Sequence, residues 1–182
     1  ARTGDTAYRD RVVQALDYLA GLGHPGSNTL AWARELGAYV LAADLVGYRK
    51  PAFDAWLVAM AETYEGTDGR RLIEVLRERP NNWGMQAFGT LAAIYAYLHD
   101  DAKLADVRTT WIQGVTGTPP QGDFGELSWH SDPIHPRVVN PARCTLHGLD
   151  VDGAIPDDLR RGAALAIPPV HTDYAWGALQ GI

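Results

Sequence analysis

Hydrophobic residues recur at helical spacing from about residue 5 to residue 113. In the first such segment, Tyr8, Val12, Leu16 and Leu19 fall on one face of a helix that spans 5–22. The same kind of pattern predicts further helices over residues 29–46, 51–64, 70–79, 85–98 and 102–113. Short turns rich in glycine and proline separate these segments, as expected where one helix ends and the next begins. The pattern therefore predicts an all-α protein.

The segment 85–98 is apolar on nearly all of its faces, which indicates a helix at the centre of the fold. No run of residues alternates between polar and apolar with a period of two, so the sequence predicts no β-strand. No motif repeats at a fixed spacing, which argues against tetratricopeptide and ankyrin arrays. The architectures that remain possible consist of helical hairpins packed side by side, arranged either as a bundle or as a closed or open toroid.

The segment 114–156 differs from the rest because it is rich in proline and shows little helical periodicity. A loop of that length in a compact domain is usually functional or disordered, and its tryptophan and histidine residues argue against disorder. A short structured segment is predicted from Pro156 onward, and one more helix is expected to begin near residue 170. That helix has barely begun at residue 182, and the chain starts with Ala1. We therefore expect a piece of a longer precursor, with a second fragment of that precursor completing the fold.

The composition excludes several classes of protein. The 182 residues suit a single domain, and a net charge of −6 with no basic block argues against nucleic-acid binding. No apolar run is long enough to span a bilayer. Cys144 is the only cysteine, which excludes an internal disulfide and a cysteine-based zinc site.

The most informative stretch is 79–84, Arg-Pro-Asn-Asn-Trp-Gly. Pro80 disfavours a helical conformation for the residue before it, so one helix ends here and another follows. One of Asn81 and Asn82 can cap the next helix, which leaves the second amide for a ligand. An indole such as Trp83 beside polar amides suits a sugar ring, which stacks on the aromatic face. The alternative interpretation is a helix cap followed by a core tryptophan.

Three motifs, in this order, resemble parts of a known family. Asn81-Asn82-Trp83-Gly84 resembles the Asn-Asn-His or Asn-Asn-Trp segment of helical-toroid polysaccharide lyases. The run 152–165 resembles the Asp-Gly…Pro…Arg-Gly-x-x-Ala-Leu run of alginate lyases, and the run 174–179 resembles their Tyr-x-x-x-Ala-Leu element. The resemblance covers roughly residues 75–182. It implies an (α/α) toroid and a secreted or periplasmic alginate-lyase-like or glucuronan-lyase-like enzyme that acts on an anionic polysaccharide without a cofactor.

The proposed chemistry is β-elimination, which removes the proton at C5 of a uronate and expels the 4-O-linked sugar. The substrate carboxylate must be neutralised, and Asn82 and Arg161 are the candidates, with Arg160 as an alternative to Arg161. The resemblance makes Tyr174 the candidate acid, and also a candidate base.

The family places a histidine where this chain has Trp83. The base is then Tyr174 itself, His171 one helical turn before it, or His130 in the loop-rich segment. Candidate substrate-binding residues are Asn81, Trp83, Trp129, Arg160 and Trp176.

Two other kinds of site were weighed. His130, Asp132 and His135 fit no strong zinc pattern, so no metal is expected. The pairs Asp157-Asp158 and Asp100-Asp101 would suit a glycoside hydrolase, but acids at helix starts commonly complement the helix dipole. A helical-toroid hydrolase and a non-catalytic carbohydrate-binding domain therefore stand beside the lyase as alternatives.

Overall fold

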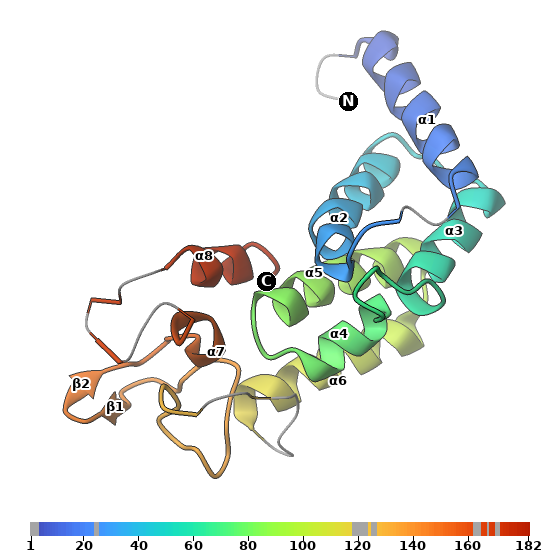
Figure 1. Ribbon diagram of the computed structural model, residues 1–182. Helices are drawn as coiled ribbons and strands as arrows, with labels where there is room; N and C mark the ends of the chain where they lie inside the picture. Colours follow the sequence, from blue (N-terminus) through green and yellow to red (C-terminus); the bar gives the residue numbers. More distant parts are fainter. Residues whose placement is uncertain are drawn as a thin grey trace.

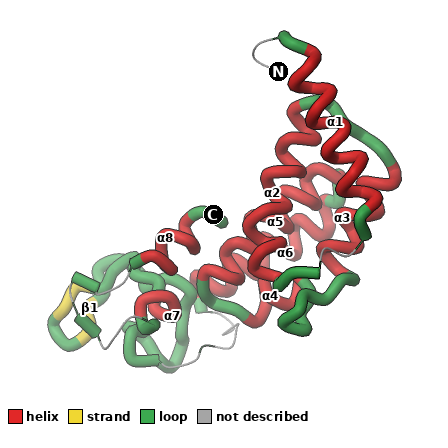
Figure 2. The backbone as a smooth tube through the Cα atoms, turned by 45° about the horizontal axis from the view of Figure 1, so that its top comes forward, coloured by secondary structure: helices red, strands yellow, loops and turns green. Residues whose placement is uncertain are grey.

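A computed structural model describes residues 4–23, 26–117, 124, 127–161, 165–166, 168–169 and 172–182. The chain is mostly helical, as the sequence predicts (Figure 1). The helices are α1 (Thr6–Gly21), α2 (Thr29–Leu45), α3 (Pro51–Glu62), α4 (Leu72–Glu78), α5 (Asn82–Leu98), α6 (Asp101–Thr116), α7 (Pro156–Leu159) and α8 (Asp173–Leu179). Helices α1 to α6 form one end of the molecule, and the loop-rich segment with α7 forms the other (Figure 2).

The six helices predicted up to residue 113 are all present, and their ends differ from the prediction by a few residues. The largest difference at a helix start is in α5, which begins at Asn82 rather than at residue 85. Asn81 is the residue that caps it, because the Asn81 side chain accepts a hydrogen bond from the backbone N–H of Trp83. The motif that we singled out in the sequence therefore caps and begins the apolar helix α5.

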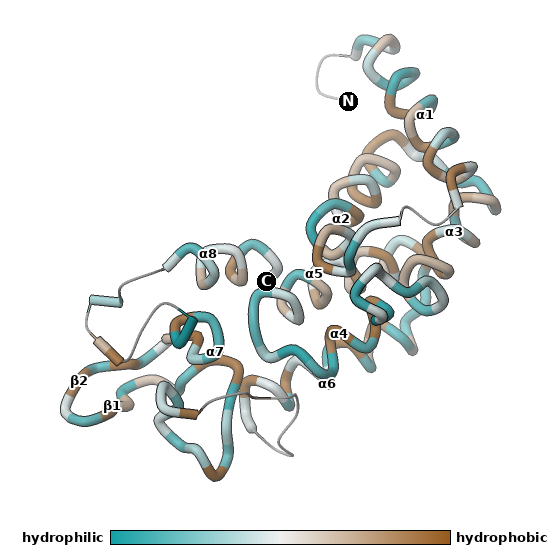
Figure 3. Tube along the Cα trace, viewed as in Figure 1, coloured by the Kyte–Doolittle hydropathy of each residue, from teal (hydrophilic) through white to brown (hydrophobic). Residues whose placement is uncertain are grey.

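Helix α5 is central, as its sequence predicts. It packs against α2, α3, α4, α6 and α8. Its buried residues include Leu91 and Ile94, which join Phe53 and Leu57 of α3 in the main hydrophobic core. The apolar stretches of these helices face one another across this core in Figure 3.

The prediction of no β-strand is wrong for one short hairpin. Strands β1 (Thr145–Leu146) and β2 (Leu149–Asp150) pair in antiparallel fashion. The turn between them consists of His147 and Gly148, with φ angles of 52° and 79°. Positive φ at both central residues is typical of a tight two-residue hairpin turn. Strands of two residues are too short to show an alternating pattern, so periodicity could not reveal them.

The loop-rich segment is ordered over its described residues by backbone and amide hydrogen bonds. The side chain of Asn140 donates to the carbonyl oxygen of Trp129 at 3.0 Å, and its backbone N–H donates to that of Ala154 at 2.8 Å. A second hydrophobic cluster, formed by Met85, Val138, Ile155 and Ala178, attaches this segment to the start of α5 and to α8. The loop-rich segment is thus fixed against the Asn81-Asn82 turn.

Two glycines allow close contacts around the first turns of α5. A Cβ atom on Gly84 would overlap the carbonyl oxygen of Arg79, which ends α4. A Cβ atom on Gly181, just after α8, would overlap the carbonyl group of Met85 and lie 2.6 Å from the backbone nitrogen of Gln86. The turn between α4 and α5 and the residues after α8 therefore both pack directly against the backbone of α5.

We expect Gly84→Ala to destabilise the fold, because the new methyl group has no space and the obstacle is backbone. Overpacking of this kind costs roughly 1–3 kcal/mol or more in free energy of unfolding. Thermal and urea unfolding would measure the loss. Gly21→Ala is the matched control, since the last residue of α1 has nothing within 4 Å of its Cβ position. Equal stability of the Gly84 variant and the wild type would show that the α4–α5 contact is looser than the structure has it.

Candidate functional site

The three motifs singled out in the sequence meet near the start of α5, where α8 packs against both α5 and α7 and where Asn81 binds Asp157 of α7. Asn81 connects two of these motifs. Its side-chain oxygen caps α5 through the Trp83 backbone N–H at 3.0 Å, and its side-chain nitrogen donates to Oδ2 of Asp157 at 2.6 Å. Asn81 is 2% exposed, so both ends of its amide are used inside the protein. Its predicted role in substrate binding stays untested, and its visible role is to join α5 to α7.

The carboxylate of Asp157 holds the two arginines that follow it. Nε of Arg160 lies 2.6 Å from Oδ1 of Asp157, and Nη2 of Arg161 lies 3.8 Å from Oδ2. The Asp157 side chain is 1% exposed, whereas those of Arg160 and Arg161 are 29% and 26% exposed. The buried Asp157 carboxylate thus holds both guanidinium groups in place, while the two arginine side chains stay partly exposed.

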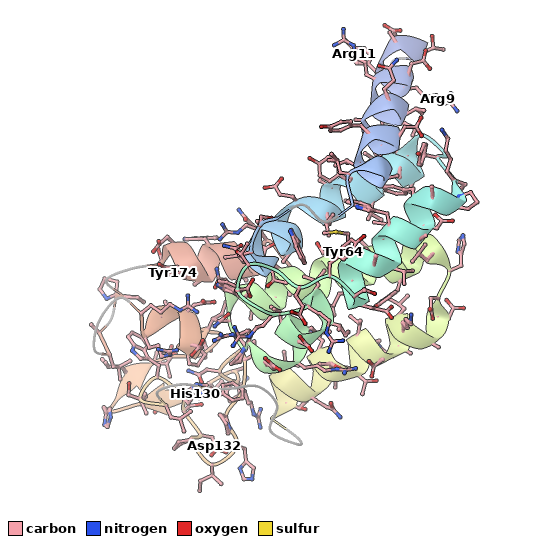
Figure 4. The ribbon with its side chains drawn as sticks, turned by 45° about the vertical axis from the view of Figure 1, so that its right-hand side comes forward. Arg9, Arg11, Tyr64, His130, Asp132 and Tyr174 are labelled. Atoms are coloured by element: carbon pink, nitrogen blue, oxygen red, sulfur yellow. The ribbon has the colours of Figure 1, made fainter. Side chains whose placement is uncertain are left out.

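The guanidinium group of Arg161 also contacts the ring of Tyr174 on α8. The guanidinium carbon lies 5.0 Å from the centroid of the Tyr174 ring, which is the geometry of a cation–π contact. Tyr174 is 41% exposed, and Figure 4 shows it on α8 at the edge of the molecule. A cation and a phenol accessible from solvent thus lie side by side, as the chemistry predicted from the sequence requires.

Asn82, in the first turn of α5, is 1% exposed. Within the described part of the chain, neither its side-chain oxygen nor its side-chain nitrogen has a hydrogen-bond partner. Gly177 of α8 covers it, since a Cβ atom on that glycine would lie 3.8 Å from Nδ2 of Asn82 and 3.9 Å from Nη2 of Arg34. Gln86 fixes this cover by donating a hydrogen bond to the carbonyl oxygen of Gly177. The expectation that one asparagine caps the helix is confirmed, and the expectation that the other amide serves a ligand stays a prediction.

Asp158 is a feature of the site that the sequence interpretation missed. It is 2% exposed, and neither carboxyl oxygen has a well-formed hydrogen bond with any described residue. Burial raises the pKa of this carboxyl to about 7. The backbone N–H of Asn82, which points at the group, and the charge of Arg161 favour the ionised form, but burial outweighs them. Asp158 is thus a carboxyl group that titrates near neutrality.

The sequence interpretation treated Asp157-Asp158 as acids that complement a helix dipole. The pair does begin the short helix α7, but both side chains are buried and Asp157 is the centre of an ion-pair network. The spacing of Asp157 to Arg160 and Arg161, three and four residues, was the available signal for that network. The other pair is as expected, because Asp100 caps α6 by accepting from the Lys103 backbone N–H at 3.0 Å.

Of the two candidate histidines, His130 lies among the described residues. His130 is 2% exposed and lies edge-on to the Phe124 ring at 5.2 Å. Figure 4 shows it in the loop-rich segment, on the side of Asp132 and apart from Tyr174. His171 lies outside the described residues.

The three predicted tryptophans differ in exposure. Trp129 is buried at 2% exposure beside His130 in the chain, and Trp83 is half-buried against the main core. Trp176 is 65% exposed on α8, close in sequence to Tyr174. Of the three, Trp176 is the one open to a ligand.

Two further observations concern the described residues alone. They hold no cluster of three metal-ligating side chains, and His135 of the weighed trio forms an exposed pair with Asp132 at 3.1 Å. Among the described helices, none has the length and apolarity needed to cross a membrane.

Comparison with known proteins adds no relative to this description. No protein-family model matches the chain, and neither a similar curated protein nor a similar solved structure was found. The function of the chain is therefore inferred from the arrangement of Asn82, Asp158, Arg161 and Tyr174.

Proposed function

We propose that this chain is a polysaccharide lyase that cleaves a uronic-acid polymer, alginate or glucuronan, by metal-independent β-elimination. The observation that carries the proposal is the convergence of three separate segments. The asparagine pair, Arg161 and Tyr174 come from distant parts of the chain and are joined through one buried carboxylate, that of Asp157. We also propose that the helical hairpins adopt an open (α/α) toroid.

The proposed reaction forms a C4–C5 double bond in the uronate and breaks the bond from C4 to the glycosidic oxygen. Arg161 binds the substrate carboxylate, and its charge offsets the negative charge that develops when C5 loses its proton. The side chain of Asn82 adds a neutral donor to the same carboxylate. Because Gly177 covers Asn82, this second contact requires α8 to move away from α5.

Tyr174 is proposed to handle both protons. Its ionised oxygen takes the proton from C5, and the resulting phenol gives a proton to the leaving glycosidic oxygen on the same side of the ring. The guanidinium of Arg161 lies over the ring of the same tyrosine. Tyr174 is favoured over His130 because His130 is buried and apart from the exposed arginine and tyrosine.

A glycoside hydrolase is less well supported, although it would use a pair of carboxylates such as Asp157 and Asp158. Asn81 and Arg160 already occupy the two oxygens of Asp157. Only one carboxyl group of the pair is left without partners among the described residues, and a hydrolase needs two.

The test is ultraviolet absorbance after the protein is mixed separately with polymannuronate, polyguluronate and glucuronan. We expect absorbance to rise with one of the polymers, because β-elimination creates an unsaturated uronate. New reducing ends without that absorbance would establish a hydrolase instead. Binding without any product would establish a carbohydrate-binding domain. Either of these two results would overturn the proposed function.

A further inference from the structure

Asn82 and Asp158 are two buried polar side chains that lie together without a hydrogen bond to any described residue. They come from different elements, the first turn of α5 and the start of α7. Their proximity follows from the Asn82 backbone N–H, which points at the Asp158 carboxyl group. Buried polar groups are nearly always hydrogen-bonded, so two neighbouring exceptions call for a common explanation.

No described residue forms an ion pair with Asp158, although the charges of Arg161 and Arg160 favour its ionised form. Directly after α7, Arg160 and Arg161 both form ion pairs with Asp157. From α8, the ring of Tyr174 contacts the guanidinium group of Arg161. From α2, Arg34 approaches Gly177 above Asn82.

On α5 itself, the group that faces Asp158 is Asn82. Burial favours the neutral form of Asp158, and no described residue forms an ion pair with it. In this protonated form the carboxyl group has one O–H group to donate. The side-chain oxygen of Asn82 is a buried acceptor that has no hydrogen-bond partner among the described residues.

We propose that Asp158 is a positioning residue for Asn82: the neutral carboxyl group donates its proton to Oδ1 of Asn82 and so keeps Nδ2 free for the substrate carboxylate. This inference rests on the proposed function, because it concerns the same carboxylate-binding group.

When Asp158 loses its proton, both of its oxygens can only accept. The Asn82 amide then satisfies them by rotating so that Nδ2 donates to Asp158. An amide that rotates by half a turn exchanges its oxygen and its nitrogen with little change of shape. The donor that the substrate needs is then used inside the protein. Because the pKa of Asp158 is about 7, uronate binding should weaken as the pH rises above neutrality.

The key variant is Asp158→Asn, which keeps a donor for Oδ1 of Asn82 and cannot ionise. Calorimetric titration with a short, unreactive uronate oligomer from pH 5 to pH 9 is the measurement. For the wild type we expect binding about tenfold weaker at pH 8 than at pH 6, since each pH unit above the pKa lowers the neutral fraction about tenfold. For Asp158→Asn we expect the affinity to change less than about twofold over the same range.

A second readout follows the amide itself. The side-chain amide signal of Asn82 in nitrogen–proton NMR spectra should shift with a midpoint near pH 7 in the wild type and stay constant in Asp158→Asn. A residue with a purely structural role would not produce this signature. Asp158→Leu, which fills a similar space without a donor, should bind the oligomer weakly at every pH. Its circular dichroism spectrum would show whether it folds.

The possible results separate the inference from the proposed function. Equal pH dependence of uronate binding in the wild type and in Asp158→Asn would overturn the inference and leave the lyase proposal standing. If no uronate binds the wild type at any pH, the lyase proposal fails. The Asn82 amide signal then decides the inference alone, because a signal that does not respond to Asp158 overturns it.

Discussion

Tyr174→Phe should lower the turnover of a cleaved uronate polymer by about 10²–10⁴-fold, the usual loss when a general acid–base group is removed. The variant removes one oxygen atom from a side chain that is 41% exposed and leaves the aromatic face toward Arg161. The fold and most of the substrate binding should therefore persist. Initial rates from ultraviolet absorbance, together with far-ultraviolet circular dichroism, would measure both effects.

The matched control for this experiment is Tyr18→Phe. Tyr18 is 69% exposed on α1, at the opposite end of the molecule from α8 (Figure 1). The same chemical change there should leave the rate unaltered. Full activity of Tyr174→Phe would show that another group moves both protons, and the proposed mechanism would then be wrong.

Asp158→Asn should alter the pH dependence of stability. In the folded protein this carboxyl keeps its proton up to about pH 7, whereas in the unfolded chain it loses the proton near the ordinary aspartate pKa of 3.8. Between these values the folded state binds more protons, so this group makes the wild type less stable as the pH rises. The loss is about 1.4 kcal/mol for each pH unit, and the variant does not share it. From pH 5 to pH 8 the stability of the variant relative to the wild type should therefore increase by about 3 kcal/mol.

Urea unfolding of both proteins at pH 5, 6, 7 and 8 would measure this difference. Asp10→Asn, on the exposed side of α1, is the control for removing a carboxylate from the surface. Its stability should run parallel to that of the wild type. Parallel curves for Asp158→Asn as well would mean that Asp158 is ionised in the folded protein at pH 5, which contradicts its position in the structure.

Much of the helical part of the fold could be predicted from the sequence because its signals are local. Helices α2 and α3 begin at Thr29 and Pro51, as the predicted ranges have it, and the apolar faces of 85–98 predict a central helix. The ordering of the loop-rich segment could not be predicted, because it depends on single long-range contacts such as those of Asn140. The turn at His147 and Gly148 is likewise too short to leave a periodic pattern.

The candidate site divides in a similar way. The sequence predicts one asparagine that caps α5 and one that is left over, and the structure has Asn81 and Asn82 in these positions. It does not predict which side chain the cap also binds, because Asp157 is 76 residues away in the chain. The burial of Asp158 escapes the sequence for the same reason. A pair of acids at a helix start is normally exposed, and only the packing of α7 against its neighbours removes this pair from water.

The double use of Asn81 couples the two ends of the molecule in folding. The amide that begins the central helix is also the amide that binds the loop-rich segment, so that segment cannot detach without leaving the buried Asp157 carboxylate and the cap exposed together. Local opening of either part then breaks the hydrogen bond that the two parts share. We therefore expect them to open as one cooperative unit in hydrogen exchange. The arginine and tyrosine side chains consequently come together only in molecules in which both parts are folded.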